Sequence, residues 1–258
     1  VLRRHHPRVC REGGLIVRLD HIKTLNEARA ARRAVVVVTN IESGEQRLVK
    51  AADAAGDPLH ELLDKHLRSG KSGMEDTPQG KVFLTVHVPS PRLVITGAVH
   101  ISQTLAPVAS LLGYDVTIVD PRTAFATPER FPDGKVLAQW PDEALPPLNI
   151  DRYTAFVALT HDPKIDDPAL LHALRRDCFY IGALGSKKTH ARRVARLKEQ
   201  GLSDDVIGHI HAPIGLDIGA VSPAEIAVAI MGEITARLRQ NPNSGEAVAR
   251  ARKTGAAA

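Results

Sequence analysis

The spacing of apolar residues divides the chain into two halves with different patterns. In the second half, short apolar runs alternate with stretches whose apolar residues recur every three or four positions. This alternation predicts strands followed by amphipathic helices, as in a mostly parallel sheet with helices on both faces. The predicted strands cover 92–96, 115–120, 155–160 and 179–184, and the predicted helices cover 101–112, 167–176, 188–200 and 223–238.

The first half has a weaker pattern, in which β-branched runs predict strands and one stretch carries leucines on a single helical face. We expect strands over 15–19, 34–39, 46–50 and 82–88, a helix over 25–33 capped by Thr24, a helix over 58–68, and a loop over 69–80. Pro89 and Pro91 mark a boundary. The prediction is a small α+β domain over 14–89, followed by a Rossmann-like α/β domain over 90–238.

The positive charge lies mostly at the two ends of the sequence. The 258 residues carry a net charge of +5, and residues 1–13 and 239–258 each contribute +3, which leaves −1 for 14–238. We expect a disordered basic start over 1–13 and a flexible tail over 239–258. Because the body is nearly neutral and only 3% of residues are aromatic, the sequence predicts no nucleic-acid partner.

Cysteine content and hydropathy indicate a cytoplasmic protein without a membrane span. Cys10 and Cys178 are the only cysteines, which argues against a disulfide framework and a cysteine-based zinc site. No apolar run approaches the roughly 18 residues of a membrane span, and the first residues lack the apolar core of a signal peptide. The twelve histidines form no HExxH pattern, so no metal site is predicted.

The first candidate site is the turn after the strand 92–96. Gly97 allows a tight turn, and the start of the following helix offers free N–H groups to an anion. Asp120 ends the next strand, where Rossmann folds place a carboxylate for ribose hydroxyls. Val99 and Ser102 replace the later glycines of the dinucleotide motif. A dinucleotide site and a βα turn that merely kept its glycine both remain open.

Two further candidates follow later strands of the same sheet. His161 and Asp162 end the strand 155–160, where side chains point into the ligand crevice, although Asp162 could simply cap the turn at Pro163. A turn containing Gly185 leads into Ser186 and Lys187, whose hydroxyl and ammonium groups suit a phosphate or form a solvated face. The helix beyond it carries basic residues on its expected polar faces: Arg192, Arg193, Arg196 and Lys198.

The fourth candidate is the loop over 211–219, which is apolar except for His211 and Asp217. Asp217 could be functional or structural. Ser222 and Glu225 stand three residues apart before an apolar helix, which predicts a capping box rather than a catalytic role for Glu225. Cys178 precedes a strand in apolar surroundings and is predicted to be buried packing.

Six motifs, taken in their order along the chain, resemble the XdhC/CoxI family of maturation factors for xanthine dehydrogenase and related molybdenum hydroxylases. The resemblance is strong over about 90–238 and looser over 24–89. The motifs are Gly97-Ala-Val-His-Ile, Asp120-Pro-Arg, Ala158-Leu-Thr-His-Asp, Ile181-Gly-Ala-Leu-Gly-Ser, Ile210-His-Ala-Pro-Ile-Gly-Leu-Asp-Ile-Gly and Ser222-Pro-Ala-Glu-Ile-Ala.

The resemblance implies an accessory protein that binds the molybdenum cofactor, molybdopterin, as cargo, with no catalytic residue of its own. It further implies two partners, a cysteine desulfurase or sulfurtransferase that sulfurates the cofactor and an apo-molybdenum hydroxylase that receives it. The family's Gly-Ser-x-Pro-Arg and Gly-Gly-Cys motifs have no match here, so no sulfur-transfer cysteine is assigned. The implied cofactor-binding residues are Gly97, His100, Asp120, Arg122, His161, Asp162, Gly185, Ser186, Lys187, Asp217 and Gly219.

The alternative is an NAD(P)-dependent oxidoreductase, which Gly97 and Asp120 would suit. Val99 and the lack of an evident Tyr–Lys pair for proton transfer weigh against it. The sequence leaves open a homodimer, the hydroxylase that is served, and the phosphate or dinucleotide form of the cofactor.

Overall fold

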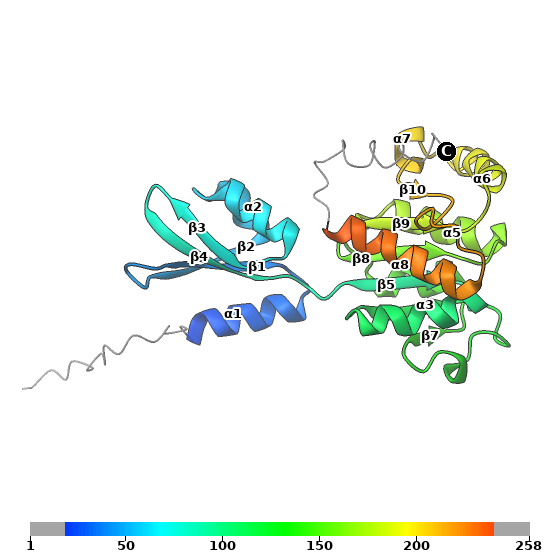
Figure 1. Cartoon of the computed structure of the whole chain (residues 1–258), viewed down its shortest axis with the longest axis horizontal. Coiled ribbons are helices and arrows are strands. Elements are labelled where there is room, and N and C mark those ends of the chain that lie inside the picture. The colour runs from blue at the N-terminus through cyan, green and yellow to red at the C-terminus, as the bar shows by residue number, and fades with distance from the viewer. Residues whose placement is uncertain (1–18, 240–258) are drawn as a thin grey trace, which may run out of the picture. The chain divides into compact units, whose positions relative to one another are not determined.

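The computed structural model describes residues 19–239, in two compact units that divide between Pro89 and Ser90 (Figure 1). The expected basic start over 1–13, most of the strand expected over 15–19 and all but the first residue of the tail expected over 239–258 lie outside the described residues.

The N-terminal unit is an antiparallel sheet with a helix on each face (Figure 1). Val35 and Val36 of the first strand are both fully buried, because α2 and the apolar residues around it cover one face and α1 lies against the other. The strand order is β2-β1-β4-β3. The elements are α1 (Leu19–Ala30), β1 (Val35–Asn40), β2 (Gln46–Lys50), a 3-10 turn η1 (Ala51–Gly56), α2 (His60–Ser69), β3 (Gly73–Thr77) and β4 (Gly80–His87).

Two expectations for this unit were wrong. Thr24 lies inside α1 rather than at its cap, because the helix already begins at Leu19. The segment expected as a loop over 69–80 contains β3, which pairs with β4 in an antiparallel hairpin. β3 reads Gly-Met-Glu-Asp-Thr and lies at the sheet edge. Such a strand is stabilised by backbone pairing and carries no apolar pattern that the sequence could reveal.

The C-terminal unit has a six-stranded sheet in which every paired strand is parallel. Its order, β10-β9-β8-β5-β6-β7, is the 3-2-1-4-5-6 arrangement of Rossmann folds read from the other edge, so the predicted Rossmann-like class is confirmed. The strands are β5 (Arg92–Thr96), β6 (Asp115–Val119), β7 (Lys135–Leu137), β8 (Thr154–Ala158), β9 (Tyr180–Ala183) and β10 (Ile210–His211).

Helices cover both faces of this sheet, as predicted (Figure 1). Alternate strand residues such as Ile95 pack against α3 and α8, which lie side by side. The strand residues in between, such as Phe156, point to the opposite face of the sheet and pack there with α4, α5, α6 and α7. The helices are α3 (His100–Leu111), α4 (Pro141–Ala144), α5 (Pro163–Leu174), α6 (Lys187–Glu199), α7 (Asp204–Ile207) and α8 (Pro223–Arg239), with 3-10 turns η2 (Pro128–Arg130) and η3 (Pro146–Leu148).

The structure also corrects two helix boundaries in this unit and adds two short strands that were not predicted. α5 begins at Pro163, four residues earlier than expected, because the Asp162 carboxylate accepts a hydrogen bond from Lys164 N at 2.9 Å and caps the helix. α8 includes Arg239, which the sequence placed in the tail. The strands β7 and β10 have three and two residues, too few to show a periodic pattern.

Candidate functional site

The predicted site residues follow the carboxyl ends of the parallel strands and therefore lie at the same end of the sheet. The strand order reverses between β5 and β8, which is where open α/β sheets form their ligand crevice. The turns after these two strands touch, since a Cβ atom added to Gly97 would lie 2.9 Å from Thr160 Cγ2 and 3.2 Å from Thr160 N. Gly97 is therefore required for the close approach of the two turns.

The turn after β5 leads into a helix without a side-chain cap. Gly97 has φ +115°, and Val99, at the N-cap of α3, has no side chain that can accept a hydrogen bond. The Ser102 hydroxyl donates to the carbonyl of Gly97 and lies 3.4 Å from Val99 N. The first N–H groups of α3, beginning at the exposed His100, are therefore available to an anion.

Asp120 and Arg122 form a fully partnered pair beside this turn. The buried Asp120 carboxylate accepts hydrogen bonds from Ala98 N at 2.7 Å, Arg122 N at 2.9 Å, Arg122 Nε at 2.9 Å and Arg122 Nη2 at 2.7 Å. Burial alone would raise the pKa of Asp120, but the hydrogen bonds from Arg122 and Ala98 outweigh it and hold the pKa below its ordinary value. The carboxylate ties two turns together and has no oxygen left for ribose hydroxyls.

The turn after β8 is held by a buried carboxylate that sequence reasoning missed. Asp166 accepts hydrogen bonds from the Thr160 hydroxyl at 2.7 Å, from Thr160 N at 3.3 Å and from His161 N at 3.0 Å. These bonds fix His161 at φ +64°, with its side chain exposed. Asp162 caps α5, so its structural alternative is realised.

The turns after β6 and β8 also interact electrostatically. The hydrogen bond to Asp120 raises the pKa of the Arg122 guanidinium, and the charges of Asp120, Asp162 and Asp166 raise it further. Arg122 additionally lies over the ring of Phe125, 5.0 Å from its centroid. The candidate residues Gly97, Asp120, Arg122, His161 and Asp162 are thus brought together around the reversal of strand order.

The turn after β9 carries the predicted phosphate-binding residues. Gly185 has φ +133°, and Ser186 caps α6 by accepting a hydrogen bond from Thr189 N at 3.2 Å. Lys187 and Lys188 are exposed. Arg193 was expected on a polar face of this helix, but it is only 2% exposed and donates from Nη2 to the carbonyl of Leu184 at 2.9 Å.

The loop after β10 is fixed at its base and exposed at its tip. Glu233 of α8 accepts hydrogen bonds from the Tyr180 hydroxyl at 2.6 Å, Gly215 N at 2.8 Å and His211 Nδ1 at 2.7 Å. The His211 ring stacks on Tyr180 with 4.7 Å between centroids. Asp217 at the tip is exposed, as is Gly219.

Tyr180 and Glu233 were not predicted as site residues, because each lies inside a regular element. Burial, and the neighbouring charge of Glu233, raise the pKa of the Tyr180 hydroxyl, which therefore stays protonated and donates. The predicted capping box is confirmed, since Glu225 Oε2 accepts from Ser222 N at 2.8 Å and Ser222 Oγ accepts from Glu225 N at 3.2 Å.

Other parts of the described chain offer less for binding. Residues 19–239 contain no group of three or more His, Cys, Asp or Glu side chains that could hold a metal ion. Burial raises the pKa of the Cys178 thiol to about 12, so it remains protonated and unreactive. No helix between Leu19 and Arg239 combines the length and the apolar content that crossing a bilayer requires.

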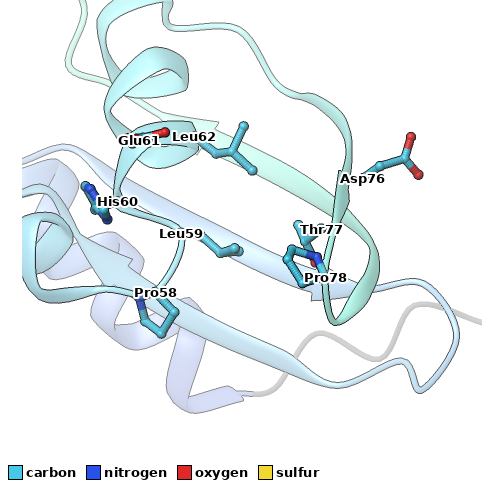
Figure 2. Close-up of a pocket in the computed structure, with 8 residues that line it drawn as sticks. All are labelled: Pro58, Leu59, His60, Glu61, Leu62, Asp76, Thr77 and Pro78. Atoms are coloured by element: carbon cyan, nitrogen blue, oxygen red, sulfur yellow. The ribbon is translucent and has the colours of Figure 1, made fainter.

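A hollow of about 180 Å³ lies in the N-terminal unit (Figure 2). Its volume is below the roughly 300 Å³ at which small-molecule sites begin. Eight residues line it: Pro58, Leu59, His60, Glu61, Leu62, Asp76, Thr77 and Pro78.

Comparison with known proteins agrees with this geometry. The model of the XdhC Rossmann domain matches residues 93–234. A probable xanthine dehydrogenase component from Bacillus subtilis is 33% identical over 154 residues, which are 59% of this chain and 44% of that protein. The molybdenum cofactor insertion chaperone PaoD from Escherichia coli is 32% identical over 157 residues, 60% of this chain and 43% of that protein. The chain thus spans less than half the length of these curated relatives.

A solved structure has the same fold. The crystal structure of a xanthine dehydrogenase from Bacillus halodurans superposes with a TM-score of 0.63 at 24% identity, covering 88% of this chain and 66% of that one. The family model, in turn, covers more than half of the sequence and includes the turns after β5, β6, β8, β9 and β10. The chain belongs to the XdhC family.

Proposed function

We propose that this protein is a maturation factor that binds the molybdenum cofactor as cargo at the carboxyl edge of the six-stranded sheet. In this proposal a cysteine desulfurase or sulfurtransferase sulfurates the bound cofactor in the cytoplasm, and the carrier then delivers it to an apo-molybdenum hydroxylase. The observation that carries the proposal is the convergence of the turns after β5, β6 and β8 in a chain that belongs to the XdhC family. Similarity to the chaperone PaoD supports it.

The residues present fit the chemistry of a pterin that carries a phosphate. A phosphate needs N–H donors and positive charge; the starts of α3 and α6 both offer N–H groups, and the exposed Lys187 at the start of α6 adds the charge. The pterin edge needs hydrogen-bond donors and acceptors, which His161 and Asp217 offer from exposed positions. Gly97 keeps the turn after β5 free of a side chain. In the proposal these residues bind and orient the cargo and carry out no chemical step.

Two observations favour a carrier over an NAD(P)-dependent oxidoreductase. The carboxylate that would hold ribose hydroxyls, Asp120, is committed to Arg122 and Ala98. Val99 places a β-branched side chain where the dinucleotide motif has its second glycine, whose bare backbone lets the pyrophosphate approach. A carrier tolerates the weaker site that results, because it must release its cargo.

Gel filtration after incubation with molybdopterin tests the proposal. The unmodified protein should co-elute with the pterin, and His161→Ala and Asp217→Ala should each reduce the bound fraction severalfold. His209→Ala and Asp205→Ala are matched controls, because both residues are exposed and precede β10, at the amino end of the strand. These two variants should bind as the unmodified protein does. Absence of co-elution, or equal loss in the controls, would reject the cargo site.

Delivery and the alternative activity are measured separately. Protein loaded with the cofactor should restore activity to an apo-molybdenum hydroxylase faster than the same concentration of free cofactor. Titration with NAD(H) and NADP(H) in a calorimeter should show no binding at micromolar concentrations. Micromolar binding of either dinucleotide, together with no transfer of the cofactor, would favour the oxidoreductase instead.

A further inference from the structure

Arg193 is a buried cation with few partners. Its side chain is 2% exposed, and its Nη2 donates to the Leu184 carbonyl at 2.9 Å. Nε and Nη1 are also buried, and neither finds a hydrogen-bond partner among the described residues. Burial lowers the pKa of Arg193, and the charges of Asp166 and Asp167 offset this only in part.

The nearby Asp166 carboxylate does not accept a hydrogen bond from the unpaired donors of Arg193. Asp166 Oδ2 lies 4.0 Å from Arg193 Nη2, beyond hydrogen-bond distance. Asp166 already accepts three hydrogen bonds from the turn after β8, on Thr160 and His161. The carboxylate is therefore well satisfied, while the guanidinium beside it retains unused donors.

The guanidinium of Arg193 lies beside two turns that carry candidate site residues. A helix side chain points back toward the start of its helix, and Arg193 accordingly reaches the Leu184 carbonyl, just before Gly185 and Ser186. Asp166 brings the turn after β8 against the same guanidinium. Arg193 thus lies between the turns after β8 and β9, below the start of α6.

We infer that Arg193 and the start of α6 form a subsite for a phosphate group, which takes up the unused guanidinium donors. This inference rests on the proposed function insofar as the phosphate is that of the cargo. The helix start adds backbone N–H groups, and Lys187 adds a second positive charge. Because Nε and Nη1 are buried, the phosphate reaches them only when a covering turn moves. The turn over 184–186 contains Gly185 and holds the carbonyl that accepts from Arg193 Nη2.

Arg193→Lys tests the subsite with inorganic phosphate as the probe. Lysine keeps the charge but loses the fork of donors. Phosphate should bind the unmodified protein in a calorimetric titration, and Arg193→Lys should weaken binding at least tenfold. Arg196→Lys is the matched control, since Arg196 lies on the same helix but is paired with Asp167. It should leave the affinity for phosphate unchanged, and equal loss in both variants would overturn the inference.

A second arm uses the cargo and measures binding on the unmodified protein, with Arg193→Lys serving only to identify a resonance. Molybdopterin and its dephosphorylated form should bind the unmodified protein with affinities at least tenfold apart, and the Arg Nε resonance that is missing from Arg193→Lys should shift on adding phosphate. If both pterins bind equally and no resonance shifts, the subsite is wrong while the cargo site stands. If phosphate binds and neither pterin does, the cargo proposal fails and the subsite serves a free phosphate.

Discussion

The turns after β5 and β9 begin alike and differ in what closes them. Each has a glycine with positive φ, Gly97 or Gly185, before a long helix, and each lies beside an Asp–Arg pair. In the first pair Asp120 and Arg122 satisfy each other through two hydrogen bonds. In the second, Asp166 and Arg193 lie 4.0 Å apart and the guanidinium keeps unused donors. The Asp120–Arg122 pair thus forms a structural clamp beside the first turn, whereas the Arg193 guanidinium beside the second turn keeps donors unused.

Replacing each glycine with alanine should produce the largest losses of stability, and the loss should be greater in the turn after β5 than in the turn after β9. We expect Gly97→Ala to cost about 3 kcal/mol, because the new Cβ meets backbone Thr160 N at 3.2 Å in addition to the positive φ. Gly185→Ala should cost about 2 kcal/mol, since the nearest atoms to its Cβ belong to the Thr189 side chain and not to the backbone of another turn. Urea denaturation measures both.

Gly201→Ala is the control that measures the cost of the positive φ without any close contact. Gly201 has φ +82° and no atom within 4 Å of an added Cβ, so its substitution should cost about 1 kcal/mol. If Gly97→Ala lowers the free energy of unfolding by no more than Gly201→Ala does, the turns after β5 and β8 do not approach as closely as the structure shows.

Removing the charge of the clamp should have the next largest effect. Asp120→Asn leaves Arg122 facing an amide, and we expect a loss of about 2 kcal/mol, below the full cost of breaking a buried pair because Arg122 is 37% exposed. Asp115→Asn should change stability by less than about 0.5 kcal/mol, since that carboxylate is 65% exposed and 3.7 Å from Arg92. Equal losses in urea denaturation would show that the clamp contributes nothing beyond a surface pair.

The comparison also shows what the sequence could and could not predict. The Rossmann-like class was predictable because β5, β6, β8 and β9 are apolar runs that alternate with amphipathic helices. Strand ends could be located from those runs, so Gly97, Asp120 and His161 were found as candidates. Asp120 was nonetheless expected to bind a ligand, whereas the structure commits it to Arg122.

The helix residues that hold the site turns in place could not be found from the sequence in the same way. Asp166, Arg193 and Glu233 are single polar residues in helices, and nothing in the local pattern distinguishes a buried one from a solvated one. Their roles depend on which turn lies against them after folding. Arg193 shows the limit clearly, because the helical pattern predicts a polar face for a residue that is 2% exposed.

The two carboxylates should give stability opposite dependences on pH. Burial alone would raise the pKa of Asp120, but its hydrogen bonds hold the pKa below the ordinary 3.8, so its contribution is present above pH 3.8 and is lost as pH falls through the folded value. Burial raises the pKa of Asp166, so the folded state binds that proton more tightly. The contribution of Asp166 is therefore greatest below pH 3.8 and is lost as pH rises through the raised value.

Urea denaturation between about pH 3 and pH 6 measures the two signs. Asp120→Asn should flatten the loss of stability on acidification, and Asp166→Asn should steepen it. Changes in the same direction for both variants would contradict the assignment, in which hydrogen bonds outweigh burial for Asp120 and burial outweighs hydrogen bonds for Asp166.

The smallest effect concerns His161, where stability and binding should move in opposite directions. Its φ of +64° is unfavourable for a residue with a side chain, and the hydrogen bond from its N–H to Asp166 maintains it. His161→Gly removes that strain and should stabilise the fold by about 0.5–1 kcal/mol, after allowing for the greater freedom of glycine in the unfolded chain. His161→Ala keeps the strain and should leave stability nearly unchanged. Both should lower the bound fraction of molybdopterin, because the exposed imidazole is the part of the residue that the proposal places against the cargo. A gain in stability with unchanged binding would mean that the strained conformation serves only the turn.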